Sequence, residues 1–169
     1  MALRNILKEG DERLRKKSRE VTDFNQRLWT LLEDMAETMK DGEGVGLAAP
    51  QVGVLRRCVV IDVGEGLHEL VNPVFLTQEG DQAGSEGCLS IPGEYGIVHR
   101  PQKVSVRYQD RYGKPHELEA QDFLAVAVCH ELDHLEGVVF TSRADRMLTD
   151  EELETGSWMD DEDAEEESE

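Results

Sequence analysis

The sequence predicts an α+β fold, in which mostly antiparallel strands pack around a central helix and another helix lies near the N-terminus. Strand-like segments cluster in the middle of the chain, with one helical segment before and one after them, whereas α/β folds alternate the two types. The chain has 169 residues, 38% of them hydrophobic, which is enough for one domain with a real core.

The first helix is expected over residues 25–40. Its apolar residues recur every three or four positions, as on one face of a helix; they are Leu28, Leu31, Leu32, Met35 and Met39. Gly42, Gly44 and Gly46 follow and end the helix.

Several strands should come next. They are residues 58–63, the short run at Leu70 and Val71 before Pro73, the region of Val98, residues 104–108, residues 118–120 and, later, residues 138–140. Residues 110–114 (DRYGK) predict a turn between two of them. The second helix is expected over residues 123–135, with Asp122 as N-cap and Gly137 closing it.

The net charge of −19 is unevenly distributed. Residues 150–169 contain 12 acidic residues and no Lys or Arg, so removing them leaves −7 for the rest. Acidic runs of this kind are usually solvated and disordered. We therefore expect one folded domain over residues 1–148, an acidic, disordered tail over residues 149–169, and no direct binding to nucleic acid.

Neither a membrane segment nor a secretion signal is predicted. No apolar run approaches the roughly 20 residues that cross a bilayer, and the first 20 residues lack the apolar stretch of a secretory signal. We expect a cytoplasmic protein. Its cysteines, Cys58, Cys88 and Cys129, are odd in number and do not predict a disulfide framework.

The most informative segment of the chain is HELDH, residues 130–134. Residues four apart share a helix face, so His130 and His134 can bind one metal ion. Glu131 lies beside them, where it can handle the proton of an activated water. The alternative is two hydrogen-bonded core histidines. Asp133 fits a supporting role, as a carboxylate that orients a ligand imidazole, or could simply be exposed.

Two histidines leave such a site one ligand short, because catalytic zinc-like sites usually have three protein ligands. No histidine follows HELDH, which excludes the HExxHxxGxxH pattern. Cys88, in SEGCLSIP, could supply a thiolate ligand or could be a buried structural cysteine.

A third segment, GVGLAAPQ at residues 44–51, is rich in glycine but lacks the Gly-Lys-Ser/Thr of a P-loop. Its glycines allow close approach of the backbone to a ligand. The side-chain amide of Gln51 could donate a hydrogen bond to an oxyanion.

GVGLAAPQ, EGCLS and HELDH, in this order, resemble the three signature motifs of the peptide deformylase family, and the resemblance spans about residues 3–148. It implies that Cys88, His130 and His134 bind one Fe2+, which Zn2+, Ni2+ or Co2+ could replace. It also implies that the enzyme removes the formyl group from N-formylmethionyl nascent peptides and releases formate.

The resemblance also implies roles for further residues. Glu131 would move the proton, while Gln51 and the backbone N–H of Leu89 would stabilise the oxyanion. The substrate would meet Val45 and Gly46 along its backbone, and Phe123, Val126 and Ala127 would line the methionine slot with Val45. Glu86 and Arg100 would form a supporting ion pair.

Two features depart from the family pattern. Tyr95 lies near the position where some bacterial members carry an Arg that meets the peptide, so preferences beyond the first residue are open. The C-terminus is acidic where many members carry a basic helix, so we expect transient ribosome proximity without a docking helix.

Two other functions share part of this pattern. A zinc endopeptidase would need a third ligand downstream of HELDH, which the histidines do not supply. A deformylase-like binding protein without activity would be expected to lack Glu131 or a metal ligand, and all are present.

Overall fold

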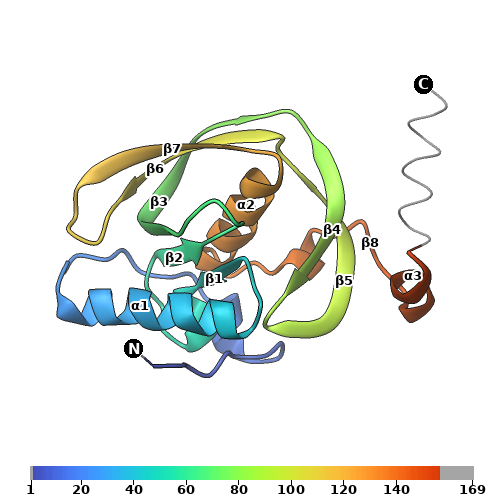
Figure 1. Cartoon of the computed structure of the whole chain (residues 1–169), viewed down its shortest axis with the longest axis horizontal. Coiled ribbons are helices and arrows are strands. Elements are labelled where there is room, and N and C mark those ends of the chain that lie inside the picture. The colour runs from blue at the N-terminus through green and yellow to red at the C-terminus, as the bar shows by residue number, and fades with distance from the viewer. Residues whose placement is uncertain (1, 157–169) are drawn as a thin grey trace.

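The computed structural model describes residues 2–156 and confirms the α+β class (Figure 1). In chain order its elements, with η for a 3-10 helix, are η1 (Glu12–Arg15), α1 (Gln26–Asp41), β1 (Gly46–Ala48), η2 (Ala49–Val52), β2 (Cys58–Ile61), β3 (His68–Glu79), β4 (Gln82–Cys88), β5 (Ile91–Arg100), β6 (Lys103–Gln109), β7 (Pro115–Gln121), α2 (Phe123–Leu135), η3 (Phe140–Ser142), β8 (Arg146–Met147) and α3 (Asp150–Thr155).

The strands form two antiparallel sheets. One has the order β1-β2-β3-β6-β7 and the other the order β4-β5-β8. Figure 1 shows α2 between them, with the long strands β3, β6 and β7 curving past it and the β4–β5 hairpin beside it. Because β1 and β4 are edge strands, each has one side that no neighbouring strand in its sheet covers.

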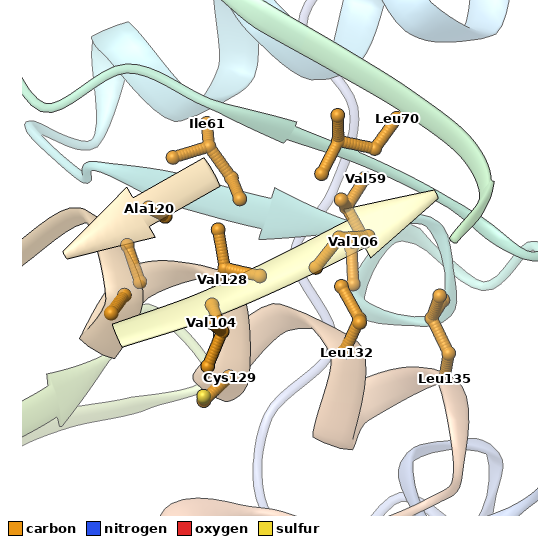
Figure 2. Packing of buried hydrophobic residues seen from close by; sticks show 13 residues of the cluster. Val59, Ile61, Leu70, Val104, Val106, Ala120, Val128, Cys129, Leu132 and Leu135 are labelled. Carbon is orange, nitrogen blue, oxygen red and sulfur yellow. The ribbon is translucent and has the colours of Figure 1, made fainter. Parts of the chain in front are cut away.

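The main core lies between α2 and the five-stranded sheet. Figure 2 shows Val128 and Leu132 of α2 packed with Val104 and Val106 of β6. Each fully buried Val or Leu side chain contributes about 1.5–3 kcal/mol relative to an exposed one. This packing fixes α2, and with it the orientation of the HELDH side chains. A second cluster joins α1 to β1 and β2.

Most predicted elements are confirmed. Helix α1 begins after Asn25, whose side chain accepts a hydrogen bond from the N–H of Leu28 at 3.3 Å, and helix α2 has the predicted bounds. Strands β2, β6 and β7 lie where apolar alternation placed them, and Gly113 closes the turn before β7 with a φ of +85°. No helix among residues 2–156 is long and apolar enough to cross a membrane.

Three local expectations were wrong or incomplete. Strand β3 continues through Pro73, because the β3–β6 register shifts between Val71 and Val74 and the missing N–H falls at that irregularity. Asp122 precedes α2 but has a φ of 57° and makes no side-chain cap; its carboxylate accepts a hydrogen bond from Gln102.

Residues 138–140 do not form the predicted strand. Gly137 turns the chain with a φ of +76°, and Phe140 begins η3 and is buried in a small cluster with Ile91, Val98 and Val139. At the end of the chain, the first residues of the expected acidic tail form α3, capped by Thr149. The rest of that expectation, over residues 157–169, lies outside the described residues.

Candidate metal centre

Three side chains from two elements bring their donor atoms together. Cys88 ends β4, whereas His130 and His134 lie one turn apart on α2. The Nε2 atoms of the histidines are 3.3 Å apart, and Sγ of Cys88 is 3.5 Å from Nε2 of His134. In the described part of the chain, this is the one group of three His, Cys, Asp or Glu residues that could hold a metal ion.

The spacing of these donors fits a tetrahedral metal ion. With metal–nitrogen bonds of about 2.0–2.1 Å and a metal–sulfur bond of about 2.3 Å, tetrahedral geometry places two nitrogens about 3.3 Å apart and nitrogen and sulfur about 3.6 Å apart. The two donor distances of 3.3 and 3.5 Å agree with both values. Sulfur and imidazole nitrogen also suit borderline cations such as Zn2+ and Fe2+.

A buried ion-pair network orients His130. Its Nδ1 donates to Oε1 of Glu86 at 2.9 Å, which leaves Nε2 for the metal. Arg100 holds Glu86 through two hydrogen bonds, Nε to Oε2 at 2.8 Å and Nη2 to Oε1 at 2.9 Å. Arg100 also donates to Asp133 at 2.7 Å, and Arg143 binds Asp133 from the other side.

The groups around His130 favour a positive charge between the three donor atoms. Burial works against protonated His130, but the charge of Glu131 and the hydrogen bonds to Cys88 and Glu86 outweigh it and raise the pKa of His130 well above its usual value. Burial and the nearby charge of His130 keep the pKa of His134 well below its usual value. Bound metal requires both imidazoles neutral, and the carboxylates that favour a histidinium would then favour the metal cation.

Glu131 is the buried acid of the site. It is 4% exposed, and its Oε1 has no hydrogen-bond partner among the described residues. Burial raises the pKa of Glu131 to about 7, partly offset by the charge of His130. A carboxylate of this pKa beside three metal donors can accept and return a proton near neutral pH.

The carboxylate of Glu131 occupies the space that a side chain at position 46 would take. A Cβ at position 46 would overlap the Glu131 carboxylate, with the carboxyl carbon 2.8 Å away. The sequence predicted that this glycine allows close approach to a ligand; the structure shows a close approach to the side chain of Glu131.

Gln51 reaches the metal donors from η2. Its Oε1 accepts from the N–H of Ala48 at 2.9 Å, which fixes the amide so that Nε2 faces Cys88 Sγ at 3.4 Å and Ser90 Oγ at 3.1 Å. The N–H of Leu89 has no acceptor among the residues that the structure describes. The N–H of Leu89 can therefore donate to an oxygen atom beside Cys88, and the amide of Gln51 can do so in exchange for its 3.4 Å contact with the sulfur.

A cavity of about 440 Å³ opens in front of these groups. His130 and Glu131 lie at its buried end. The substrate-binding residues that the family resemblance implied all line it, and they are Val45, Gly46, Phe123, Val126 and Ala127. Val45 and Phe123 are exposed, so the cavity is open to solvent on that side.

The other histidines lie apart from this group. His99 pairs with Asp81 and Asp145, and His116 pairs with Asp110. The contact with a ligand imidazole that Asp133 was expected to make belongs to Glu86 instead. Asp133 supports the site through Arg100.

Three side chains that were not predicted from the sequence also contribute to the site. Ser90 is fully buried, and its Oγ accepts a hydrogen bond from Nε2 of Gln51. Phe140 stacks on His130 with ring centroids 5.9 Å apart, and Arg143 forms an ion pair with Asp133. Ser90 lies within EGCLS, and its buried polar group could have been suspected. Nothing in the sequence marks Phe140 or Arg143, because their contacts depend on the turn at Gly137.

Comparisons with known proteins agree with this geometry. The family model described as polypeptide deformylase matches residues 3–150. The chain is 60% identical over 154 residues to the peptide deformylase of Thermoanaerobacter pseudethanolicus, covering 91% of this chain and 97% of the relative. It is 61% identical over 154 residues to that of Caldanaerobacter subterraneus, with the same coverage of both chains.

Solved structures are similar as well. The crystal structure of peptide deformylase from Thermotoga maritima matches with a TM-score of 0.84 and 39% identity, covering 85% of this chain and 99% of that one. The deformylase of Synechococcus elongatus, solved in complex with actinonin, matches with a TM-score of 0.81 and 39% identity, covering 83% and 78%.

Proposed function

Because this chain belongs to the polypeptide deformylase family, we propose that Glu131, Gln51 and Leu89 carry the proton transfer and charge stabilisation of deformylation. The enzyme is a metal-dependent hydrolase that removes the formyl group from the N-terminal formylmethionine of nascent polypeptides and releases formate. The observation that supports the assignment most is the convergence of three metal donors beside the unpartnered Oε1 of Glu131.

Cys88, His130 and His134 would hold one ion, which we propose is Fe2+, with Zn2+, Ni2+ or Co2+ as substitutes. The donor set supports a borderline cation of this group. When bound, such an ion lowers the pKa of a coordinated water to roughly 7 and polarises a carbonyl. Metal analysis after anaerobic purification would identify it.

The protein's own groups then act in order. Oε1 of Glu131 accepts a proton from the attacking water as oxygen bonds to the formyl carbon. The amide of Gln51 and the N–H of Leu89 donate to the formyl oxygen as it becomes negative. Glu131 returns the proton to the departing methionine nitrogen as the C–N bond breaks, giving formate and a free amino terminus.

The cavity positions the substrate for this step. The outer edge of β1 at Gly46, next to Val45, would pair with the peptide backbone as an added strand. Phe123, Val126 and Ala127 would enclose the methionine side chain. The Glu86–Arg100 pair, with Asp133, would keep His130 in its ligating orientation.

The cellular setting is also proposed. We infer a cytoplasmic enzyme whose catalytic domain covers residues 1–148, and whose residues 149–169 form an acidic tail. Twelve acidic residues there would repel ribosomal RNA, so we infer transient proximity to the ribosome without docking through this segment.

Formate release separates this function from an endopeptidase. The enzyme should release formate from formyl-Met-Ala-Ser and leave the internal bonds of an acetylated peptide of the same sequence intact. Internal cleavage without formate release would contradict the proposal.

A further inference from the structure

The mouth of the active-site cavity carries negative charge and no positive charge. Glu43 lies in the turn between α1 and β1, and Glu94 lies in β5; both are exposed and both line the cavity. Among the described residues neither has an ion-pair partner, and no Lys or Arg lines the cavity. Lys8 donates to the carbonyl oxygen of Leu89 at 3.3 Å but is not part of the lining.

The two glutamates come from different segments, the α1–β1 turn and strand β5, and the fold holds these segments together. The side chain of Leu89, at the end of the β4–β5 hairpin, packs against Gly42 and Gly44 on either side of Glu43; a Cβ at position 44 would lie 2.8 Å from it. On the hairpin itself, the ring of Tyr95 lies against Gly87, where a Cβ would be 2.5 Å from it. These contacts hold the backbone at Glu43 and Glu94 beside the same opening.

A bound peptide must pass this opening. The reacting groups His130 and Glu131 are buried at one end of the cavity, whereas Val45, Tyr95 and Phe123 are exposed at the other. When the formyl end of the peptide lies at His130 and Glu131, the residues that follow methionine lie near the exposed end of the cavity. Charges interact over roughly 10 Å at 0.1 M salt, so Glu43 and Glu94 at this opening can act on charged side chains that pass it.

We propose that Glu43 and Glu94 make this enzyme prefer formylated chains with Lys or Arg just after the formylmethionine, and disfavour chains with Asp or Glu there. This inference rests on the deformylase function and adds a substrate preference to it. Exposed charge pairs each change binding by a few-fold at most, so the preference is a graded one. It acts on substrate binding and appears in KM, while kcat stays similar.

The test compares formyl-Met-Lys-Lys-Ala, formyl-Met-Glu-Glu-Ala and the neutral formyl-Met-Ala-Ala-Ala, all with the metal-loaded enzyme at low salt. The ratio of kcat/KM for the lysine peptide to that for the glutamate peptide should be about fivefold or more. About 1 M salt, which shortens the screening length to about 3 Å, should remove most of it.

Variants show whether these two residues cause the preference. The pair Glu43→Gln and Glu94→Gln should lower the ratio to about twofold or less, and Glu94→Lys should lower it further or reverse it. The matched pair Glu65→Gln and Glu119→Gln removes the same charge from exposed positions outside the cavity and should leave the ratio unchanged.

Two results would overturn the inference. One is an equal kcat/KM for the two charged peptides in the unmodified enzyme. The other is an equal loss of preference in both double variants, which would assign the effect to the overall charge of −19. Failure to deformylate even the neutral peptide would instead contradict the function itself.

Discussion

The carboxylate of Glu131 lies directly against the backbone of Gly46, so a side chain at position 46 would overlap it. The contact links the GVG segment to the HELDH helix. It also places the unpartnered Oε1 of Glu131 at the cavity that Gly46 lines. The position of the proposed proton carrier therefore depends on the absence of a side chain at position 46.

Gly46→Ala should displace Glu131 while leaving the metal donors in place. We expect kcat to fall by about 100-fold or more, the scale of a lost general base, with metal content near one ion per chain. Steady-state formate release and metal analysis measure both. Gly84→Ala is the control, since a Cβ there meets nothing within 4 Å; similar losses in the two variants would refute the steric explanation.

Metal removal should reveal one reactive thiol. Burial raises the pKa of Cys58 to about 12 and that of Cys129 to about 11, which keeps both protonated and unreactive. Cys88 is only partly buried and is blocked when it binds metal. Iodoacetamide at pH 8 should label one thiol per chain after chelation and almost none before, by mass spectrometry.

The Cys88→Ala variant should show no labelling under either condition. Equal labelling of Cys88 with and without metal would contradict a Cys88 ligand, whereas label on Cys58 in the folded protein would contradict the protection of that thiol by burial.

Arg100→Leu should destabilise the fold and loosen the metal. It leaves Glu86 buried without its guanidinium partner, a change that typically costs about 3–5 kcal/mol. Because Glu86 orients His130, metal should also pass to a chelator faster than from the unmodified enzyme. Arg107→Leu breaks an exposed pair with Glu117 and should cost about 1 kcal/mol or less. Unchanged metal retention in Arg100→Leu would rule out this supporting role.

The contribution of Asp34 to the free energy of unfolding should depend on pH. Burial opposes its charge, but the backbone N–H of Ala2 and the guanidinium of Arg4 outweigh burial and lower its pKa below the ordinary 3.8. Its contribution is therefore complete above about pH 4 and is lost as pH falls through the lower folded value.

Asp34→Asn should lower the free energy of unfolding by about 1–3 kcal/mol at pH 7, and by less at pH 3.5. Urea unfolding at the two pH values measures the difference. A loss that is larger at pH 3.5 would contradict the lowered pKa.

The sequence predicted helices α1 and α2 and the class of chemistry well, because their patterns are local. Helix α2 has both its apolar periodicity and its histidine spacing within 13 residues. Strand β4 escaped prediction because QAGSEGC has little apolar alternation; it is fixed by pairing with β5. The same long-range pairing brings Glu86, and not the sequence neighbour Asp133, to His130. Contacts set by the sheets could not be derived from spacing along the chain.

Replacing Glu131 with glutamine tests the central claim most directly, because the two side chains have nearly the same shape. Formate release from formyl-Met-Ala-Ser should fall by at least about 100-fold, while metal analysis still finds about one ion per chain held by Cys88, His130 and His134. Turnover close to that of the unmodified enzyme, with the metal still bound, would show that Glu131 is not the proton carrier.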